Sequence, residues 1–318
     1  MKPLRRLMIT ITAGLAAMSL TPAAQAAPNP VLASPYLYQW GAKPNPVTVM
    51  NQTGVKAFTL AFILSDGGCN PAWDGQRPLT GADATLIRNI RAAGGDVIPS
   101  FGGWSGRKLG PNCSSATALA AAYQKVIDAY QLKAIDIDIE NTDEFENATV
   151  QDRVLGALKI VKQRNPAIKT VVTMPTNRSG LNSWGTRLVT RSKELAAPVD
   201  VWAVMPFNFG GPSDLVAGTK SAVDGLKNHV KATFGLTDDA AYRRSGLSSM
   251  NGVTDTGETV TTAQFRAIRD WAAGKHLSRF TFWATNRDRG NCGASGSDCS
   301  GTNQGTYDFT KIVAGYTG

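Results

Sequence analysis

The sequence predicts a single-domain α/β protein that folds as a (β/α)₈ TIM barrel, and three observations support this prediction. Eight short β-rich apolar runs alternate with helix-like segments along the chain. The alternation continues without a low-complexity linker, over a length that suits one barrel of ~250 residues. No convincing Gly-rich phosphate loop follows an early strand, which disfavours an open doubly wound sheet. Strands that alternate with helices are expected to run parallel, and eight in one domain are expected to close.

Residues 1–26 have the features of a secretory signal peptide and are excluded from the predicted fold. A basic start precedes the apolar or small run Leu7–Leu20, and Ala24-Gln25-Ala26 is a small-x-small cleavage site. A membrane anchor is the alternative, but the apolar run is shorter than the ~20 residues that a bilayer span needs. We therefore expect one mature domain at residues 27–318, secreted to the extracellular space and without a membrane partner.

The predicted strands share a β-rich apolar composition and lie at Val31–Tyr38, Ala57–Ile63, Asp96–Phe101, Ala134–Ile139, Thr170–Met174, Val199–Pro206, Gly246–Met250 and Arg279–Ala284. The predicted helices carry apolar residues at helical spacing and lie at Asp83–Ala93, Ser115–Tyr130, Val150–Gln163, Ser221–Phe234, Thr262–Ala273 and Phe309–Gly315. Asp83 is a plausible N-cap for the first of these helices. In a barrel of this kind the chemistry lies on loops at the carboxyl ends of the strands.

The charge of the chain does not indicate a nucleic-acid partner. The formal net charge is +9, and about +6 without the three basic residues of the leader. We find no cluster of Lys and Arg and no nucleic-acid motif, so the basic excess is interpreted as solvated surface. A monomer is the expected oligomeric state.

Four cysteines lie in loop-like sequence, and an even count in an exported protein favours disulfides. Cys292 and Cys299 enclose a Gly/Ser-rich segment and are expected to pair locally. Cys69 and Cys113 would then join two loops. A metal site is the alternative, but no C-x-x-C spacing occurs and the chain has only two histidines.

The most informative segment ends the fourth predicted strand. Side chains alternate along a strand, so Asp136, Asp138 and Glu140 share one face, and the isoleucines between them share the other. The isoleucines suit the face that packs against helices, which directs the acids into the barrel. Carboxylates crowded there repel and desolvate one another, so at least one is expected to keep a proton near neutral pH. Glu140 lies nearest the open end and is the candidate general acid.

Two other interpretations of this acidic row are possible. A solvated acidic face is common on antiparallel sheets, but barrel strands have no solvated face. Three carboxylates could instead hold calcium or magnesium. The strand context favours catalysis over both.

These residues resemble the signature of glycoside hydrolase family 18, the chitinases and endo-β-N-acetylglucosaminidases, written D-G-x-D-x-D-x-E. The later acids match as Asp136, Asp138 and Glu140, whereas the first Asp and the Gly are replaced by Lys133 and Ala134. Both replacements lie at the start of the strand, away from the expected chemistry.

Four further segments resemble family elements in the same order along the chain. Ser100–Trp104 is similar to the S-x-G-G element of the third strand, and Met205–Gly210 to the sixth-strand M-x-M-D-Y-G of one bacterial branch. Met250–Asp255 and Phe282–Asp288 are similar to the seventh-strand and eighth-strand elements of that branch. The resemblance thus spans nearly the whole mature chain.

One departure concerns the group that holds the substrate. The sixth-strand element of the family offers a Tyr and an Asp near the reacting sugar, and here these positions read Phe209 and Asn208. Phe209 cannot donate the hydrogen bond that the Tyr gives to the acetamido carbonyl. We expect lower activity, a shifted substrate, or rescue by Asn208, Tyr36 or Tyr38.

The resemblance implies substrate-assisted hydrolysis with retention, without metal or cofactor. Glu140 would protonate the glycosidic oxygen, and the N-acetyl carbonyl of the substrate would attack the anomeric carbon. Asp138 would orient the acetamide, and Asp136 would tune Asp138. Chitin or another N-acetylglucosamine-containing glycan is the implied partner.

Further substrate-binding residues are expected at the strand ends. Trp283 would form the floor under the reacting sugar, and Gly102 belongs to the S-x-G-G element. Trp104 and Trp73 are candidates for neighbouring sugars, with core packing an equal alternative. Another set, expected to line the cleft mainly as packing, comprises Met174, Pro175 and Met205.

Three alternative functions remain open at this point. An intact Glu140 argues against a barrel that binds glycans without cutting them, whereas the missing Tyr favours it. An endo-β-N-acetylglucosaminidase acting on N-glycans, or a peptidoglycan-directed enzyme, would keep the same acids. A barrel outside the glycosidases is disfavoured by the five elements in register.

Overall fold

The structure is a computed structural model that describes residues 29–210 and 214–318. The predicted signal peptide, residues 1–26, and the predicted start of the mature chain at residue 27 lie outside the described residues.

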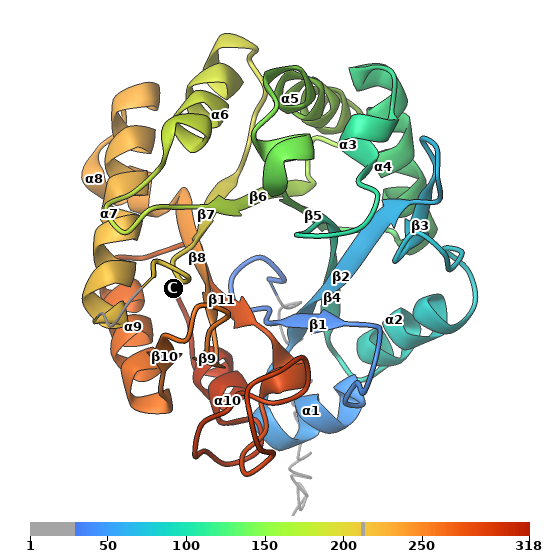
Figure 1. Cartoon of the computed structure of the whole chain (residues 1–318). Helices are drawn as coiled ribbons and strands as arrows, with labels where there is room; N and C mark the ends of the chain where they lie inside the picture. Colours follow the sequence, from blue (N-terminus) through green and yellow to red (C-terminus); the bar gives the residue numbers. More distant parts are fainter. Residues whose placement is uncertain (1–28, 211–213) are drawn as a thin grey trace, which may run out of the picture.

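Eight parallel strands form a nearly closed barrel surrounded by helices (Figure 1). In chain order, and each paired with the next, they are β1 (Tyr36–Tyr38), β2 (Ala57–Ser65), β4 (Asp96–Gly102), β5 (Ala134–Asp138), β6 (Lys169–Pro175), β7 (Val201–Met205), β8 (Ser245–Met250) and β11 (Arg279–Trp283). At the seam the backbone N–H of Phe280 in β11 donates to the carbonyl of Leu32, 2.9 Å away and shortly before β1. The predicted fold and all eight predicted strands are confirmed, although β1 begins later than expected because residues 30–32 form a turn.

The helices lie outside the strands (Figure 1) and are α1 (Pro46–Thr53), α2 (Ala82–Ala92), α4 (Ala116–Tyr130), α5 (Ala148–Arg164), α6 (Ser183–Glu194), α7 (Leu215–Phe234), α9 (Thr262–Gly274) and α10 (Asp308–Ala314), with the short α3 (Leu109–Asn112) and α8 (Asp238–Tyr242). The sequence prediction missed α1, α6 and the two short helices α3 and α8. The two longer missed helices, α1 and α6, carry a cap signal. Both begin at an asparagine N-cap, because the side chain of Asn45 accepts from two backbone N–H groups and that of Asn182 accepts from Gly185. These caps are the sequence signal that could have revealed both helices.

The predicted N-cap role of Asp83 is wrong. Gly81 is the N-cap of α2, and no side chain caps that helix. Asp83 lies in the first turn, where it is buried and accepts a hydrogen bond from Nε of Arg77 at 2.9 Å. The ion pair with Arg77 therefore draws this carboxylate away from the capping position.

The two faces of β5 have the predicted polarity. Ile135, Ile137 and Ile139 are fully buried in the core between the strands and the helices. Asp136 lies on the opposite face and is also fully buried. At the amino end of the barrel Arg279 closes the interior, where its guanidinium donates to the Val31 carbonyl at 3.0 Å and to neighbouring hydroxyls.

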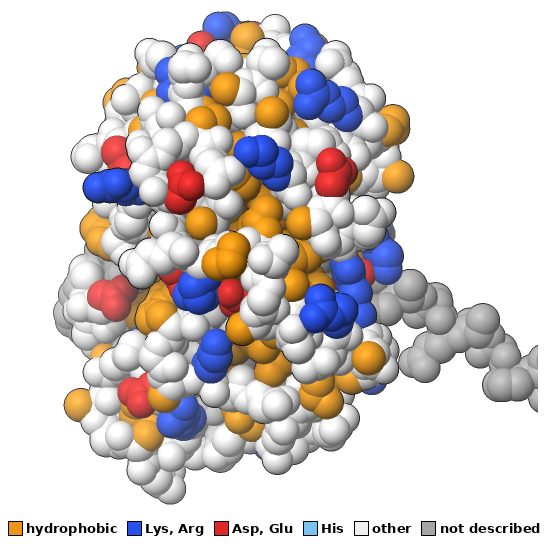
Figure 2. Space-filling view, turned by 90° about the vertical axis from the view of Figure 1, so that its right-hand side faces the viewer, with side chains coloured by type: hydrophobic (Ala, Val, Ile, Leu, Met, Phe, Trp, Pro, Cys, Tyr) orange, Lys and Arg blue, Asp and Glu red, His pale blue; other side chains and the backbone are white. Residues whose placement is uncertain are grey.

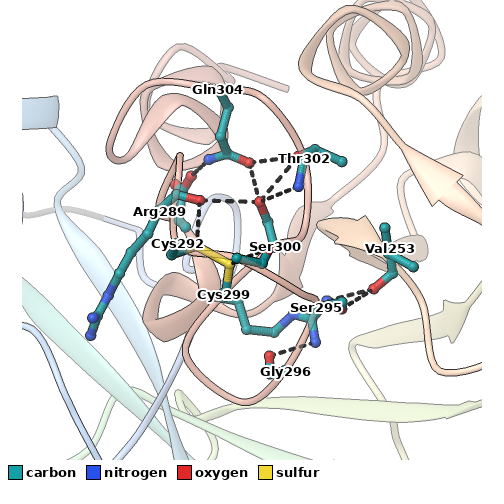
Figure 3. Close-up of a disulfide and its surroundings, with 12 residues drawn as sticks. Val253, Arg289, Cys292, Ser295, Gly296, Cys299, Ser300, Thr302 and Gln304 are labelled. Carbon is teal, nitrogen blue, oxygen red and sulfur yellow. Dashed lines mark hydrogen bonds between the residues drawn. A yellow bond between two sulfur atoms is a disulfide. The ribbon is translucent and has the colours of Figure 1, made fainter.

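Both predicted disulfides are present, and both lie in segments that follow the carboxyl ends of strands. Cys69 follows β2, beside the antiparallel strand β3 (Pro71–Trp73), and pairs with Cys113 at the end of α3. The loop that follows β11 contains the Cys292–Cys299 pair (Figure 3). This pairing leaves no free cysteine in the described residues.

The loop of the second disulfide is held by its own polar side chains (Figure 3). Ser300 Oγ lies within hydrogen-bond distance of two acceptors, the Arg289 carbonyl at 3.1 Å and Gln304 Oε1 at 2.7 Å. Arg287, in the short 3₁₀ turn Thr285–Arg287 after β11, donates to the carbonyls of Gly296 and Val253. Val253 belongs to the small hairpin of β9 (Gly252–Val253) and β10 (Thr259–Val260), so the loop is tied to the segment after β8.

Figure 2 shows a face on which Lys and Arg side chains are scattered among Asp and Glu instead of gathering in one patch. This distribution agrees with the interpretation of the basic excess as solvated surface on this face. Within residues 29–210 and 214–318, no helix has the length and hydropathy to cross a bilayer.

Candidate active site

A cleft of about 610 Å³ opens at the carboxyl ends of the barrel strands. Its lining residues come from loops and strand ends around the barrel and comprise Tyr36, Phe62, Trp104, Asp138, Glu140, Pro175, Thr176, Met205, Phe207, Asn208, Ser248, Met250, Asp255 and Trp283. The position of the cleft is the one expected for the chemistry of a parallel barrel.

The acidic row of Asp136, Asp138 and Glu140 extends from the barrel interior to this cleft. Asp136 is deepest and accepts hydrogen bonds from Tyr36 Oη at 2.8 Å, Ser100 Oγ at 2.6 Å and Thr173 Oγ1 at 2.7 Å. These donors come from β1, β4 and β6, so one carboxylate joins three other strands to β5. Tyr36 keeps its proton for this bond, because burial raises the pKa of its phenol well above the usual value.

Asp138 lies one inward position above Asp136 and lines the cleft. It is 3% exposed, and its Oδ1 has no hydrogen-bond partner among the described residues. Burial, followed by the charges of Glu140 and Asp136, raises the pKa of this carboxyl well above the usual value. The protonated form of Asp138 is therefore favoured at the base of the cleft.

Glu140 lies just beyond the end of β5, in extended backbone at the start of a π-helical turn (Asn141–Phe145), and it is partly exposed to the cleft. Burial of its carboxyl is the main cause that raises its pKa to about 7, with Asp255 acting in the same direction and Lys108 in the opposite one. A carboxyl group with this pKa holds a proton on about half of the molecules near neutral pH. Such a group can donate a proton and then accept one at the same pH.

Aromatic rings form part of the cleft lining. The ring of Trp283 stacks on Phe62 with centroids 5.6 Å apart and planes at 8°, and on Tyr38 at 5.2 Å. Tyr36 also packs against Trp283, at 5.7 Å. Trp104 lines the cleft from the loop after β4 and is 67% exposed. The cleft thus combines apolar ring faces with carboxyl groups, which suits a ligand with C–H faces and polar substituents.

The sixth-strand element enters the cleft with a different aromatic residue from the one that the sequence indicated. Phe207 and Asn208 line the cleft, whereas Phe209 does not. The ring of Phe209 lies under the guanidinium of Arg178, 5.0 Å from its carbon, and packs against the core between strands and helices. The prediction of Phe209 as a substrate contact is therefore corrected, because the backbone turns at Asn208, with φ of 58°, and directs the next side chain outward.

Asn208 has polar partners within the cleft. Its Nδ2 donates to Asp255 Oδ2 at 2.9 Å, and its Oδ1 accepts from Thr256 Oγ1 at 3.4 Å. Asp255 comes from the segment after β8, so two distant parts of the chain meet at the cleft wall.

Several other predicted residues have different positions from those expected. Trp73 is a core residue of β3 with no exposed surface, and its Nε1 donates to Tyr130 Oη at 2.8 Å. It therefore cannot contact a sugar, and the packing alternative is correct. Met174 is fully buried behind the cleft wall, and Gly102 lies against the Asp138 carbonyl outside the lining. Pro175 does line the cleft.

The structure also brings residues into the cleft that sequence reasoning did not single out. Phe62, Thr176, Phe207 and Ser248 all belong to this group. Each lies at or near the carboxyl end of a strand, so strand-end position was the available signal. In the described part of the chain, no group of three or more His, Cys, Asp or Glu side chains is arranged to hold a metal ion.

Comparisons with known proteins identify relatives, although no protein-family model matches this chain. A probable bifunctional chitinase/lysozyme of Escherichia coli is 27% identical over 263 residues, covering 77% of this chain and 29% of that protein. Endochitinase 11 of Metarhizium anisopliae is 27% identical over 252 residues, covering 74% of this chain and 48% of that protein. The chain thus spans less than half the length of these curated relatives.

A solved structure covers the chain more completely. It is active domain 2 of a thermostable chitinase from Pyrococcus furiosus, with catalytic-site mutations and bound chito-oligosaccharides. It is 27% identical, with a TM-score of 0.83, and the match covers 94% of this chain and all of that domain. The similarity therefore extends over nearly the whole length of the chain.

Proposed function

We propose that this chain is a member of glycoside hydrolase family 18, a secreted chitinase that cleaves β-1,4-linked N-acetylglucosamine polymers with retention of configuration. Its similarity to chitinases supports this proposal. The main support for this function is the position of Glu140. Its carboxyl group is partly exposed, has a pKa of about 7 and lies at the cleft end of a buried acidic row. Two relatives support chitin or its oligosaccharides as the substrate class: one is named an endochitinase, and the other is a chitinase complexed with chito-oligosaccharides.

In this proposal Glu140 acts first as acid and then as base. Its proton passes to the glycosidic oxygen while the bond from that oxygen to the anomeric carbon breaks. The carbonyl oxygen of the substrate's own N-acetyl group forms the new bond to that carbon and gives an oxazolinium ion. Glu140, now ionised, removes a proton from water, whose oxygen attacks the same carbon and opens the oxazolinium ring.

Asp138 and Asp136 support the two steps from below. Burial and the neighbouring charges favour the protonated form of Asp138, and its carboxyl group would orient the substrate's acetamide by accepting a hydrogen bond from the acetamide N–H. Asp136 is held by three hydroxyl donors below the cleft and would tune Asp138, which stabilises the oxazolinium ion. No metal or cofactor takes part in this scheme.

The sugar at the point of cleavage would lie on Trp283, whose ring is braced by Phe62. The acetamido carbonyl needs a hydrogen-bond donor, and the aromatic ring of Phe207 offers none. Tyr36 is an unsuitable replacement because its hydroxyl already donates to Asp136. We therefore assign the donor to the amide of Asn208, which is held at the cleft wall by Asp255.

The decisive experiment is hydrolysis of chitotetraose by Glu140→Gln. We expect loss of hydrolysis with retained binding, and a matched control, Glu146→Gln, changes an exposed glutamate six positions further along and should keep full activity. Wild-type rates in Glu140→Gln would eliminate this acid.

Side-by-side assays separate the substrate alternatives. Reducing-end release from chitotetraose and colloidal chitin supports the proposal. Cleavage restricted to a high-mannose glycoprotein would assign an endo-β-N-acetylglucosaminidase, and cleavage restricted to peptidoglycan would assign a cell-wall enzyme. Binding without release of reducing ends would assign a glycan-binding barrel.

Secretion is part of the same proposal. The signal-peptide features of residues 1–26 support it, and so do two disulfides, which form and persist in oxidising compartments. N-terminal sequencing of the exported protein should give Ala27 as the first residue, followed by one barrel domain at residues 27–318. Sedimentation should give the mass of a monomer.

A further inference from the structure

A lysine ammonium is buried beside the turn that follows Glu140. Lys108 is the N-cap residue of α3, and its side chain is 1% exposed. Nζ donates to Asp143 Oδ1 at 2.8 Å and to the Trp104 carbonyl at 3.4 Å. A charge removed from water to this degree is costly unless opposite charges and hydrogen bonds compensate it.

Three acidic groups, Asp143 and Glu144 in this turn and Glu140 at its start, interact with this ammonium. Asp143 forms the ion pair and is 45% exposed. Glu144 is 2% exposed, and its Oε2 has no hydrogen-bond partner among the described residues. Burial raises the pKa of Glu144 to about 8, against the opposing effect of Lys108, so this carboxyl is mostly neutral near pH 7. The ammonium is therefore paired with Asp143 and also lowers the pKa of Glu140.

The same contacts join the candidate acid to the loop of Trp104. The Trp104 carbonyl accepts from Lys108 Nζ and also from Asn141 Nδ2, at 2.9 Å. Asn141 directly follows Glu140 and has a φ of 71°. The exposed tryptophan at the cleft and the carboxyl at its centre thus share one small hydrogen-bonded unit.

We propose that Lys108 is a positioning residue: its buried ammonium fastens the Trp104 loop to the Glu140 turn and keeps Glu140 able to ionise after it has given up its proton. This inference rests on the proposed function, in which Glu140 alternates between acid and base. Lys108 does not reach into the cleft and acts only through Glu140 and Trp104.

The charges around Glu140 show why Lys108 is needed. Asp255, from the segment after β8, raises the pKa of Glu140, and Asp138 below it and Glu144 beside it are further acidic groups of the same cluster. Arg279 acts on Asp138 from the floor of the barrel. Lys108 is the positive group that opposes burial at Glu140 itself. Without it the carboxyl would keep its proton and the water-activating step would slow.

The test compares pH profiles of kcat/KM for chitotetraose. Lys108→Met should move the alkaline limb upward by about one pH unit, the lower end of what an opposite charge at close range produces. Lys108→Arg should restore the wild-type limb. Lys162→Met is the matched control, because Lys162 is a largely buried lysine paired with Asp200 elsewhere in the barrel, and it should leave the limb in place. An unmoved limb in Lys108→Met would overturn the proposal.

The variant Asp143→Asn should shift the alkaline limb of the kcat/KM profile in the opposite direction. It tests the role of Lys108 even if Lys108→Met does not fold. Loss of the Asp143 charge leaves the ammonium with less compensation, so its effect on Glu140 grows and the alkaline limb moves to lower pH. An upward shift, or no shift, would contradict the proposed role of Lys108.

A direct titration separates this inference from the proposed function. Carbon-13 NMR of labelled glutamate carboxyls, assigned with Glu140→Gln, should show Glu140 titrating at higher pH in Lys108→Met. If no glycan is hydrolysed, the proposed function fails and this titration still tests Lys108. If hydrolysis depends on Glu140 and the titration is unchanged in Lys108→Met, the inference alone fails.

Discussion

Replacement of Glu140 by Gln should stabilise the protein, but only at pH values above 4.5, the usual pKa of this carboxyl. Folding raises the pKa of this carboxyl from its usual 4.5 to about 7, mainly through burial. An acid with a raised pKa opposes folding wherever the unfolded chain would be ionised. The penalty is absent below pH 4.5, grows between pH 4.5 and 7, and is complete above pH 7. Gln has nearly the same shape and no charge, so the variant escapes this penalty.

The size of the stabilisation follows from the change in the Glu140 pKa on folding. Each unit of pKa corresponds to about 1.4 kcal/mol, so the stabilisation at pH 8 has an upper limit of about 3 kcal/mol. For a barrel of this size that corresponds to an increase in Tm of about 5 °C. At pH 4 both forms of the side chain are neutral, and the two proteins should melt within about 1 °C of each other.

The assay is urea unfolding followed by circular dichroism at pH 4, 6 and 8 for the wild type, Glu140→Gln and the exposed control Glu146→Gln. The difference in unfolding free energy should rise with pH for Glu140→Gln and stay flat for the control. A difference that does not depend on pH, or a variant less stable than the wild type at pH 8, would refute the assignment of a raised pKa to Glu140.

Three further predictions concern the floor, the hydroxyl network and the cross-links. Trp283→Ala should raise KM for chitotetraose about tenfold, because loss of the ring face removes roughly 1.4 kcal/mol of contact, and an unchanged KM would contradict its role as the floor. Tyr36→Phe removes a charge-assisted hydrogen bond to a buried carboxylate and should lower the unfolding free energy in urea by about 2 kcal/mol; equal stability would show that the bond is not formed. Replacement of Cys69 and Cys113 by Ser opens a cross-link of sequence separation 44 and should cost about 4 kcal/mol in the same assay, whereas loss of the second disulfide, of separation 7, should cost about 2 kcal/mol. Equal losses for the two disulfides would argue against the chain-entropy account.

The acidic row was predictable because strand periodicity is a local property. Two-residue alternation separates Asp136, Asp138 and Glu140 from the isoleucines, and parallel strands in a barrel leave only the interior for the acids. The structure keeps this alternation from Ala134 through Glu140, although the strand itself ends at Asp138. The eight strands were predictable for the same reason.

The positions of side chains after a strand ends were not predictable in this way. Phe209 faces outward because one residue, Asn208, takes a positive φ, and nothing in the local pattern marks that turn. Trp73 is buried because a short antiparallel strand carries it under the rim, where Tyr130 from α4 provides a partner for its indole. Lys108 has no motif at all, because its burial depends on acids that are distant in the sequence.

The cradle of Asp136 has a consequence for how such barrels diverge. The hydroxyls that hold this carboxylate belong to three other strands, so the deepest acid acts as a brace for the fold, whereas Glu140 is an electrostatic burden on it. A duplicated copy released from selection for catalysis gains stability by discarding Glu140 and loses stability by discarding Asp136. We therefore expect homologues that have lost catalytic activity to retain Asp136 long after Glu140 has been replaced.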